Sequence, residues 1–401
     1  MRNKKRKVTV FITFLVSSII ILQYWFLQNK LSVTGTSRHA MTAKLAFNNE
    51  PRKHVSNKDD LKLVLFYTPL FGKSPWPGLA NDYNFTHWNH IPCGVQACRA
   101  SYNRRDLARS DAVIFHGRDL PSVMHMKQIL KQKSPQQRWV YFIHESPKFT
   151  YYDPWLYNGY FNWTMSYRRD SDFVVPYRTY TRLQPDEIVR VQAENRNYAN
   201  GKDRLLVWIV SHCKGIREDY VRKLMKYIKV DVFGSCSRRF NQTETCPRSS
   251  AACDNKLKRY KFIFALENSY CVDYITEKYW YTPLDHDNVP LVLGGADYND
   301  KNAIPGSFIN ILDFSSVESL ANYLLYLDRN DTAYNEYFSW RRHFKPVLPE
   351  SWTCQMCAAL NNDSLPSKVY NNIDEFWGER SNCGKNERRI QEFLGSLIEE
   401  T

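Results

Sequence analysis

One segment of the 401-residue chain, residues 262–278, constrains the fold more than any other. Its first five residues are apolar, as in a strand that is buried on both faces of a parallel sheet. A turn with acidic and amide side chains follows. We then predict a helix that carries Tyr274, Glu277 and Lys278 on one face, because residues three and four apart are neighbours on a helix. With the apolar run at residues 289–293, this order of strand, helix and strand predicts an open α/β sheet with a ligand site at the carboxyl ends of its strands.

The side chains on the predicted helix indicate the kind of ligand. The ammonium of Lys278 suits an anionic group such as a nucleotide diphosphate, and the carboxylate of Glu277 suits sugar hydroxyls or a developing positive charge. The chain has 55 Lys and Arg against 41 Asp and Glu, a formal net charge of +14. Such an excess suits a nucleotide sugar, an anionic membrane surface or nucleic acid. The N-terminal topology described below argues against nucleic acid.

Strand and helix patterns alternate along most of the chain. Helical patterns occur at residues 216–228, after a capping box at residues 315–318, and at residues 386–399. The basic, turn-rich residues 189–203 separate two groups of strands and form the candidate interdomain connection. Continuous apolar runs, which predict strands of parallel sheets covered on both faces, lie at residues 62–68, 112–116, 139–144, 205–211, 230–233, 261–266 and 289–293. We therefore predict two doubly wound domains that face each other across a cleft.

The N-terminal residues indicate a membrane anchor. Residues 8–27 form a hydrophobic run of roughly the 20 residues that a membrane-spanning helix needs. Basic residues precede this run, which predicts a cytosolic N-terminus. A cleaved signal peptide is the alternative, but the aromatic residues 24–26 make a poor cleavage site. The predicted parts are a cytosolic tail at 1–7, a signal-anchor at 8–27, a stem at 28–60, an acceptor-side domain at 61–195, a donor-binding domain at 196–350 and a closing segment at 351–401.

Two further features suit an oxidising, glycosylating space beyond the anchor. The chain has ten cysteines, an even number. Asn-X-Ser/Thr triplets make candidate glycosylation sites of Asn84, Asn162, Asn241, Asn330 and Asn362. We expect disulfides at two cysteine pairs, which are Cys93 with Cys98 and Cys354 with Cys357. Either the two pairs bridge to each other or each pair closes on itself, and spacing alone leaves the pairing open.

Two segments that follow predicted strands offer catalytic and anion-binding groups. Glu145 comes directly after the strand at 139–144, and Pro147 prevents that strand from continuing. A carboxylate that is partly desolvated there has the raised pKa that a general base needs. Residues 211–217 follow another strand and open a helix, whose N-terminus suits a phosphate and whose Arg217 can add a bidentate contact.

Two Asp-X-Asp triplets, at residues 170–172 and 285–287, are candidate metal-binding motifs. In metal-dependent nucleotide-sugar enzymes such carboxylates hold Mn²⁺ or Mg²⁺ against the diphosphate. The triplet is short and common by chance. Asp170 and Asp172 are therefore weak candidates, and we assign no metal site.

Four motifs together resemble those of the α-1,3/4-fucosyltransferases, glycosyltransferase family 10, over roughly residues 60 to 360. They are Phe-Ala-Leu-Glu-Asn-Ser at 264–269 with 273–278 and 289–294, similar to the donor signature; Phe-Ile-His-Glu-Ser-Pro at 142–147, similar to the catalytic-base segment; Asp-Ser-Asp at 170–172 with Pro-Tyr at 176–177; and Ala-Val-Ile-Phe-His-Gly-Arg-Asp at 112–119, similar to the acceptor-reading segment. The resemblance implies a GT-B fold, a GDP-fucose donor, inversion at fucose C1, and a single-pass type II enzyme of the Golgi membrane with a lumenal catalytic domain.

The resemblance also assigns roles to individual residues. It implies that Glu145 is the general base, that Arg217 and Lys278 bind the diphosphate, and that Glu277 supports positive charge on the sugar. Further implied contacts are Tyr274, Glu267 and Asn268 on the donor side, and His116, Arg118 and Asp119 on the acceptor side. Gly117 stands where relatives commonly have a second His, and Arg118 in place of Trp favours 1,3 over 1,4 linkage.

Other functions make different predictions. A metal-dependent Golgi glycosyltransferase would need an Asp-X-Asp ligand and would lose activity in chelator, whereas a type II lectin-like or scaffold protein would need no donor site. The resemblance implies no tightly bound cofactor, with Mn²⁺ or Mg²⁺ at most stimulatory. The expected acceptor contains GlcNAc, as an N-glycan core, an antennal LacNAc or a LacdiNAc, and the sequence assigns no oligomeric state.

Overall fold

The computed structural model describes residues 61–80, 85–86, 92–192, 196–213, 215–247, 250–298 and 301–399. The predicted tail, membrane anchor and stem, residues 1–60, lie outside the described residues. Within the described ranges, every helix is too short or too polar to cross a membrane.

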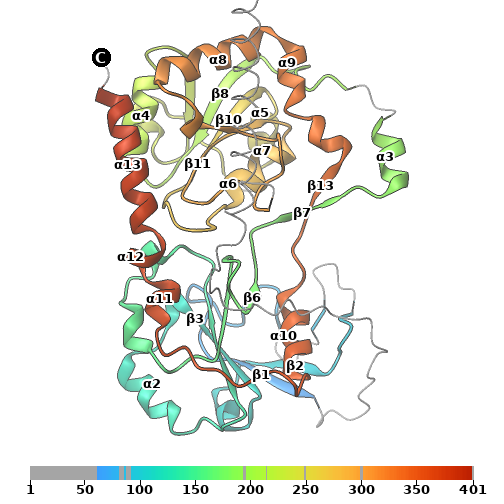
Figure 1. Cartoon of the computed structure of the whole chain (residues 1–401), viewed down its shortest axis with the longest axis vertical. Coiled ribbons are helices and arrows are strands. Elements are labelled where there is room, and N and C mark those ends of the chain that lie inside the picture. Colours follow the sequence, from blue (N-terminus) through green and yellow to red (C-terminus); the bar gives the residue numbers. More distant parts are fainter. Residues whose placement is uncertain are drawn as a thin grey trace, which may run out of the picture. The chain divides into compact units, whose positions relative to one another are not determined.

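The first sheet has six parallel strands in the order β2-β1-β3-β4-β5-β6 (Figure 1). They are β1 Lys62–Phe66, β2 Cys98–Ser101, β3 Ala112–His116, β4 Arg138–Phe142, β5 Trp163–Ser166 and β6 Phe173–Val174. The prediction found β1, β3 and β4 but missed the other three. β6 has only two residues, and β2 and β5 have four residues each with polar residues among them, so none of the three shows a long continuous apolar run.

The second sheet has five parallel strands in the order β12-β11-β10-β8-β9. They are β8 Arg204–Ile209, β9 Val230–Phe233, β10 Tyr260–Leu266, β11 Val289–Leu293 and β12 Ile309–Asn310. All seven residues of β10 are buried, because this strand lies in the middle of the sheet with helices on both faces. The parallel α/β prediction is therefore confirmed for both sheets, with strand ends shifted by one or two residues.

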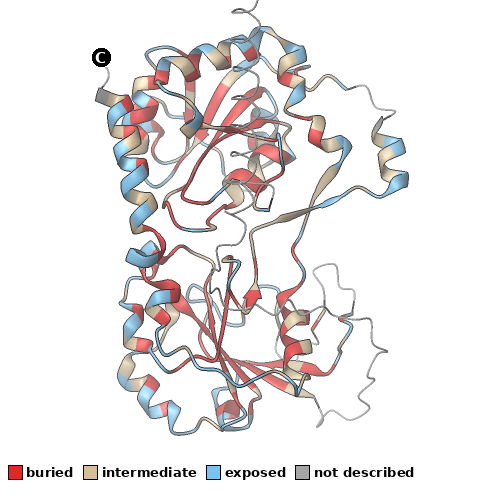
Figure 2. Ribbon diagram, viewed as in Figure 1, coloured by how far each residue is buried: buried red, intermediate tan, exposed pale blue. Residues whose placement is uncertain are grey.

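Helices cover both faces of the second sheet. The helices α4 Ile216–Leu224, α8 Val317–Arg329 and α13 Gly384–Glu399 share one core with alternate residues of β8, β10 and β11. The opposite face packs on α5 Ala251–Leu257, α6 Glu277–Trp280 and α7 Thr282–Asp285. Figure 2 shows the strands of both sheets as mostly buried and the covering helices as exposed on one side. The sheet therefore has no solvent-facing side, as its apolar strands require.

The first sheet is covered in part by the end of the chain. Helix α10 Trp352–Leu360 packs on one face, and α2 Val123–Leu130 with α11 Ile373–Trp377 packs on the other. The structure joins Cys93 to Cys354 and Cys98 to Cys357, so the two cysteine pairs bridge to each other. The chain then passes through α12 Glu379–Asn382 into α13, which belongs to the core of the second sheet.

The remaining elements are short. Strands β7 Thr179–Arg182 and β13 Phe344–Val347 form an antiparallel pair, and α3 Pro185–Gln192 and α9 Asp331–Glu336 complete the set of α-helices and strands in the described ranges. Helix α3 overlaps the stretch predicted as a turn-rich connection. The predicted domain boundary at residues 195 and 196 is not tested and stays a prediction.

The capping box of α8 differs by one residue from its prediction. The helix is capped by Ser316, whose Oγ accepts from the Ser319 amide at 2.9 Å while Ser319 Oγ accepts from the Ser316 amide at 3.2 Å. A serine at the third helical position thus takes the role that we had given to Glu318, because both side chains can reach the cap amide.

The two long-range disulfides should stabilise the fold redundantly. When both cysteines of one bridge are replaced by Ala, the other bridge still joins the two segments. Only a short loop is then opened, and the free energy of unfolding should fall by about 2–3 kcal/mol. Removing both opens loops with sequence separations of 261 and 259 residues, and the further loss should be about twice as large in the chain-entropy model. Urea unfolding of both single-bridge variants and of the double variant measures this. Equal, additive losses would contradict it.

Candidate functional site

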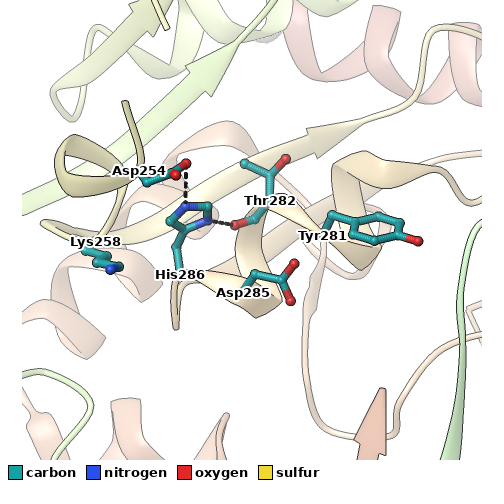
Figure 3. Close-up of a pocket in the computed structure, with 6 residues that line it drawn as sticks. All are labelled: Asp254, Lys258, Tyr281, Thr282, Asp285 and His286. Atoms are coloured by element: carbon teal, nitrogen blue, oxygen red, sulfur yellow. Dashed lines mark hydrogen bonds and ion pairs between the residues drawn. The ribbon is translucent and has the colours of Figure 1, made fainter. Parts of the chain in front are cut away.

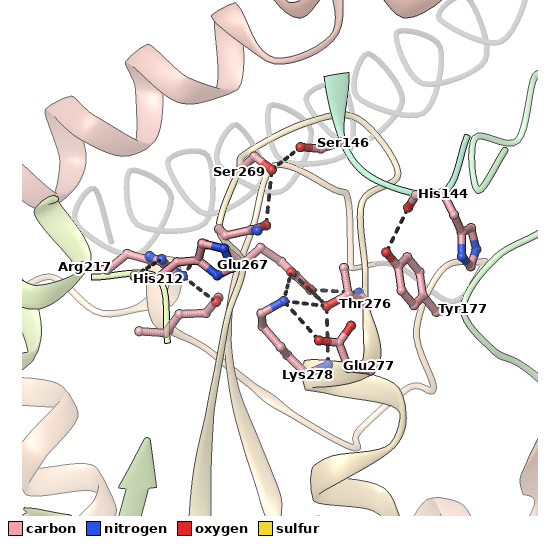
Figure 4. A network of polar contacts seen from close by, with 12 residues as sticks. His144, Ser146, Tyr177, His212, Arg217, Glu267, Ser269, Thr276, Glu277 and Lys278 are labelled. Carbon is pink, nitrogen blue, oxygen red and sulfur yellow. Dashed lines mark hydrogen bonds and ion pairs between the residues drawn. The ribbon is translucent and has the colours of Figure 1, made fainter. Parts of the chain in front are cut away.

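The carboxyl ends of the central strands of the second sheet carry the predicted donor-binding residues (Figure 4). Glu267 directly follows β10, and residues 267–276 connect that strand to α6. Arg217 lies in the first turn of α4, after β8. Gly294 and Gly295 follow β11. The topology thus brings three separate segments to one edge of a parallel sheet, where such folds bind ligands.

The carboxylate of Glu267 organises the start of α6. It is wholly buried and accepts from the Thr276 amide at 2.8 Å and from Thr276 Oγ1 at 2.9 and 3.0 Å. Lys278 Nζ donates to Glu267 Oε2 at 3.2 Å and to Thr276 Oγ1 at 3.0 Å. Glu267 has no exposed surface, and its side chain contacts Thr276 and Lys278; the direct donor contact expected there stays a prediction.

Lys278 is the partly exposed cation of this site, with 26 % of its side chain accessible. Its ammonium lies 3.2 Å from Glu267 and 3.5 Å from Glu277 Oε1. Burial acts to lower the pKa of Lys278, but the two carboxylates outweigh burial and raise it above its ordinary value. Lys278 is therefore protonated at neutral pH and available to an anion.

Arg217 is fixed by main-chain carbonyls. Its Nη1 donates to the carbonyl oxygens of Leu266 and Glu267, each at 3.0 Å, and its Nη2 donates to that of His212 at 3.4 Å. Burial lowers its pKa, although a guanidinium keeps its charge in proteins. Arg217 lies at the start of α4, after the loop that follows β8, as predicted from the sequence; its contact with an anion stays a prediction.

Tyr274 lies elsewhere than predicted. Helix α6 begins only at Glu277 with Thr276 as its cap, so Tyr274 precedes the helix and does not share its face. Its ring is 2 % exposed and packs against Tyr167 and Tyr177, with centroid distances of 5.0 and 6.2 Å. Asp273 has a positive φ of 58°, which turns the chain before the helix. Continuing the helical pattern back from Glu277 was wrong because this turn and the Thr276 cap interrupt it.

Glu145 follows β4 with its carboxylate partly exposed. Its neighbours on both sides are fixed: Tyr177 Oη donates to the His144 carbonyl at 2.8 Å, and Ser269 Oγ donates to Ser146 Oγ at 2.5 Å (Figure 4). The second contact joins the segment after β4 directly to the segment after β10. Burial, and after it the negative charge of Glu145, raise the pKa of Tyr177. The structure therefore brings the predicted base segment and the donor segment together.

The acceptor-side residues form a hydrogen-bonded group after β3. His116 is wholly buried, with Nδ1 2.5 Å from Asp119 Oδ2, and burial lowers its pKa. Asp119 also accepts from the amides of Phe71 and Gly72 at 2.8 and 3.1 Å. The guanidinium of Arg118 lies over the ring of Phe71 at 5.3 Å. His116 thus supports this group from within, and Arg118 and Asp119 are its partly exposed members.

Gly117 is required by packing. A Cβ there would lie 2.8 Å from Ile143 Cδ1 and 3.0 Å from Tyr141 Oη. This crowding accounts for a glycine at this position.

The Asp-X-Asp triplets are engaged in local structure. Asp170 forms a two-point ion pair with Arg168 at 2.8 and 2.5 Å, and Asp172 accepts from the Thr164 amide and from Tyr370 Oη, both at 2.9 Å. Among the described residues, one cluster has ligand spacing for a metal, and its two cysteines, Cys213 and Cys236, are disulfide-bonded.

The second triplet lies at a surface depression of about 460 Å³ (Figure 3). Asp285 pairs with Arg178 at 2.8 Å, and His286 lies between the Thr282 carbonyl at 2.6 Å and Asp254 at 3.1 Å. The depression is lined by α5, α7 and their flanking residues, not by the segments that carry Glu267 and Arg217.

The candidate glycosylation sites differ in access. Asn241 is exposed, Asn330 and Asn362 are partly exposed, and Asn84 lies outside the described residues. Asn162 is buried: its Nδ2 donates to the Lys368 carbonyl at 2.8 Å and its Oδ1 accepts from Lys133 and from the Trp139 amide. The structure therefore contradicts a glycan at Asn162, because this amide is used inside the fold.

Several residues that shape the site were missed from the sequence. No local pattern in the sequence predicts the hydrogen bond between Ser146 and Ser269, which lie 123 positions apart. Cys271 is joined to Cys383, which ties the segment after β10 to the start of α13. Thr276 could have been found, since Thr followed by a helix-starting Glu is a common N-cap pattern.

Comparisons with known proteins show the family of the chain. The family models described as "Fucosyltransferase, N-terminal" and "Glycosyltransferase family 10 (fucosyltransferase) C-term" match residues 59–178 and 199–377. The chain belongs to glycosyltransferase family 10. It is therefore a glycosyltransferase, and the resemblance drawn from the four motifs is confirmed.

Three curated proteins similar to this chain come from different animals. Glycoprotein 3-alpha-L-fucosyltransferase A of Drosophila melanogaster is 31% identical over 81% of this chain and 62% of its own length. Alpha-(1,3)-fucosyltransferase 4 of Mus musculus is 30% identical over 87% of each chain. A 3-galactosyl-N-acetylglucosaminide 4-alpha-L-fucosyltransferase of Bos taurus is 38% identical over 66% of this chain and 70% of its own. A crystal structure of an alpha1,3-fucosyltransferase aligns with 76% of this chain and 83% of its own, at 15% identity and a TM-score of 0.39.

Gly295 should be essential for the shape of the donor segment. A Cβ at this position would lie 2.0 Å from the Tyr270 carbonyl oxygen and 2.8 Å from the Cys271 amide. Gly295→Ala must displace that segment, and we expect a stability loss of at least about 1–3 kcal/mol, the usual cost of overpacking, together with weaker GDP binding. Gly395→Ala in α13 is the control, because no atom lies within 4 Å of its added Cβ; it should be neutral or stabilising by up to about 1 kcal/mol. Thermal melts with and without GDP measure both, and a Gly295→Ala variant as stable as wild type would contradict the assigned packing.

Proposed function

We propose that this chain transfers L-fucose from GDP-fucose, with inversion, to the 3-hydroxyl of a GlcNAc residue in glycoprotein or glycolipid glycans. The observation that carries the proposal is the pair of cations, Arg217 and Lys278, held beside Glu267 at the carboxyl edge of a parallel sheet. Family membership supports the donor, and relatives named as 3-alpha or alpha-(1,3) enzymes support the linkage.

The donor side needs electrostatic stabilisation more than covalent chemistry. As the bond from fucose C1 to GDP breaks, negative charge collects on the diphosphate and positive charge on the sugar ring. Lys278 and Arg217 would stabilise the first, because fixed charges in a partly buried site need little reorganisation. Glu277, whose carboxylate lies beside Lys278 and remains partly exposed, would stabilise the second.

The acceptor side needs a base. Glu145 is partly exposed, and its segment is joined to the donor segment through the Ser146–Ser269 hydrogen bond. In this proposal Glu145 takes the proton from the acceptor hydroxyl as the oxygen attacks C1 from the face opposite the departing GDP. Arg118 and its aromatic neighbours would help to position the acceptor. Attack from that face accounts for inversion.

The location of the enzyme is part of the proposal. The hydrophobic run at residues 8–27 after basic residues supports a single-pass anchor in the Golgi membrane, with the body in the lumen. Five described disulfides fit an oxidising compartment. A GT-B arrangement of the two sheets is the expected architecture for this reaction.

A transfer assay tests the proposed function. The purified full-length chain, with GDP-fucose and a panel of GlcNAc-containing glycans, should release GDP and form a fucosylated product whose linkage is read by NMR. Because the donor contacts are cationic side chains, turnover should continue in EDTA, with Mn²⁺ or Mg²⁺ acting at most as a stimulant. Absence of transfer to every glycan by a chain that binds GDP would contradict the proposal, and complete loss of turnover in EDTA would favour a metal-dependent glycosyltransferase.

Glu145→Gln should separate chemistry from donor binding. The substitution keeps the shape of the side chain and removes its basicity, so kcat should fall about 10²- to 10⁴-fold while GDP affinity stays within about twofold. Glu318→Gln, an exposed change on α8, is the matched control and should leave both quantities unchanged. Near-normal turnover of the Glu145 variant would assign the proton transfer to another group.

A further inference from the structure

Glu267 is placed to act on a ligand only through other residues. It is the first residue after β10, and its side chain is wholly enclosed. Gly294 leaves room for this side chain, since a Cβ at Gly294 would lie 3.4 Å from Glu267 Cγ and 2.9 Å from Tyr298 Oη. The carboxylate is therefore packed from one side and hydrogen-bonded from the other.

Both cations of the site converge on this one residue. The main-chain carbonyl of Glu267 accepts from Arg217 Nη1 at 3.0 Å, and its carboxylate accepts from Lys278 Nζ at 3.2 Å. Arg217 comes from α4 and Lys278 from α6, so the two lie on different elements of the sheet edge. Glu267, at the end of the central strand, thus contacts two cationic side chains that come from distant parts of the sequence.

Both carboxylate oxygens of Glu267 must accept hydrogen bonds. The Thr276 amide, the Thr276 hydroxyl and the Lys278 ammonium all point at the Glu267 carboxylate. An ionised carboxylate has only acceptor sites, which matches three donors. Glutamine has nearly the same shape, but its NH₂ group would have to face either the Thr276 amide or the Lys278 ammonium, and neither of these groups can accept a hydrogen bond. The neutral substitution therefore disturbs Lys278, directly or through Thr276, while leaving the volume of the core unchanged.

We propose that Glu267 is a positioning residue that fixes the Lys278 ammonium, directly and through Thr276, in the place where it receives the diphosphate of the donor. This inference rests on the proposed function and reassigns Glu267 from a donor contact to the support of one. A charge held in place before the ligand arrives binds more tightly than one that must be ordered on binding.

The charge of Glu267 also affects the titration of Lys278. The charged groups that act on Lys278 are Glu267 at the end of β10, Glu277 on its own helix and Arg217 from α4. Burial and Arg217 act to lower the pKa of Lys278, and the two carboxylates act to raise it. Removing the charge of Glu267 therefore lowers this pKa, so that Lys278 loses its proton at a lower pH than in the wild-type chain.

The experiment compares wild type, Glu267→Gln, Lys278→Ala and the double variant as full-length chains. GDP affinity is measured by calorimetry, and kcat/KM for GDP-fucose is measured across pH. Glu267→Gln should weaken GDP binding at least about tenfold, the loss of one charge-assisted hydrogen bond, and should move the alkaline limb of kcat/KM to lower pH. The acceptor KM should stay within about twofold. In the Lys278→Ala background, Glu267→Gln should change GDP affinity by less than about threefold, because its effect passes through Lys278.

Asp106→Asn is the matched control, since Asp106 is also a buried carboxylate paired with a cation, Arg109, but lies beside β2 of the first sheet. It should lower the melting temperature and leave GDP affinity and the alkaline limb unchanged. A folded Glu267→Gln variant with wild-type GDP affinity, or with an unmoved alkaline limb, overturns the proposal. So does an equal loss in the wild-type and Lys278→Ala backgrounds.

A second variant and the wild-type transfer assay complete the test. If Glu267→Gln does not fold, Thr276→Val tests the same link, because it removes the hydroxyl that contacts both Glu267 and Lys278. Weaker GDP binding by at least about threefold then supports the proposal, and unchanged binding overturns it. Wild-type transfer in the same assay separates the two levels: if wild type transfers no fucose, the proposed function fails, whereas wild-type transfer with unaffected variants defeats only the role of Glu267.

Discussion

The buried carboxylate of Glu267 at the end of β10 is the interaction on which the site depends. Burial raises the pKa of Glu267, so its ionised form needs donors around it. Here the donors are the amide and hydroxyl of Thr276 and the ammonium of Lys278. Satisfying this one group therefore determines where α6 begins and where its lysine lies. The requirement is met within the twelve residues 267–278, so strand, turn and helix form a single local unit.

That unit is in turn tied to other parts of the chain. Ser269 bonds to Ser146, Asp273 accepts from the Arg169 amide at 3.1 Å, and Cys271 is joined to Cys383. Two of these contacts reach segments after strands of the first sheet, and the third reaches the end of the chain. The donor segment cannot move far without disturbing the neighbour of Glu145. In the proposed reaction this link would keep the base and the donor in register, which matters because a displacement of about 1 Å can cost about 10²-fold in rate.

How much of this could be predicted depends on the physical signal involved. Continuous apolar runs identified β10 and β11, because a strand that is buried on both faces has apolar residues at nearly every position. Strands β2, β5 and β6 are too short to show such an apolar run. Lys278 and Arg217 could be proposed as site cations because they come after predicted strands. The role proposed for Glu267 depends on its burial, which the sequence of a turn does not reveal. Tyr274 was placed wrongly since periodicity could not show that Thr276 starts the helix. Pairing of Cys93 with Cys354 required the return of α10 to the first sheet, a contact over 261 positions that no local pattern encodes.

The balance of charge at the sheet edge suits a site that must release its product as well as bind its substrate. Arg217 and Lys278 supply two positive charges, and Glu267 and Glu277 supply two negative charges close to Lys278. An uncompensated pair of buried cations would hold GDP tightly after transfer and slow its release. Glu277 lies 3.5 Å from Lys278 and is partly exposed, so part of the attraction of the lysine is already satisfied and the diphosphate gains less from binding. In the proposed reaction Glu267 would hold the lysine in place, and Glu277 would keep GDP exchangeable.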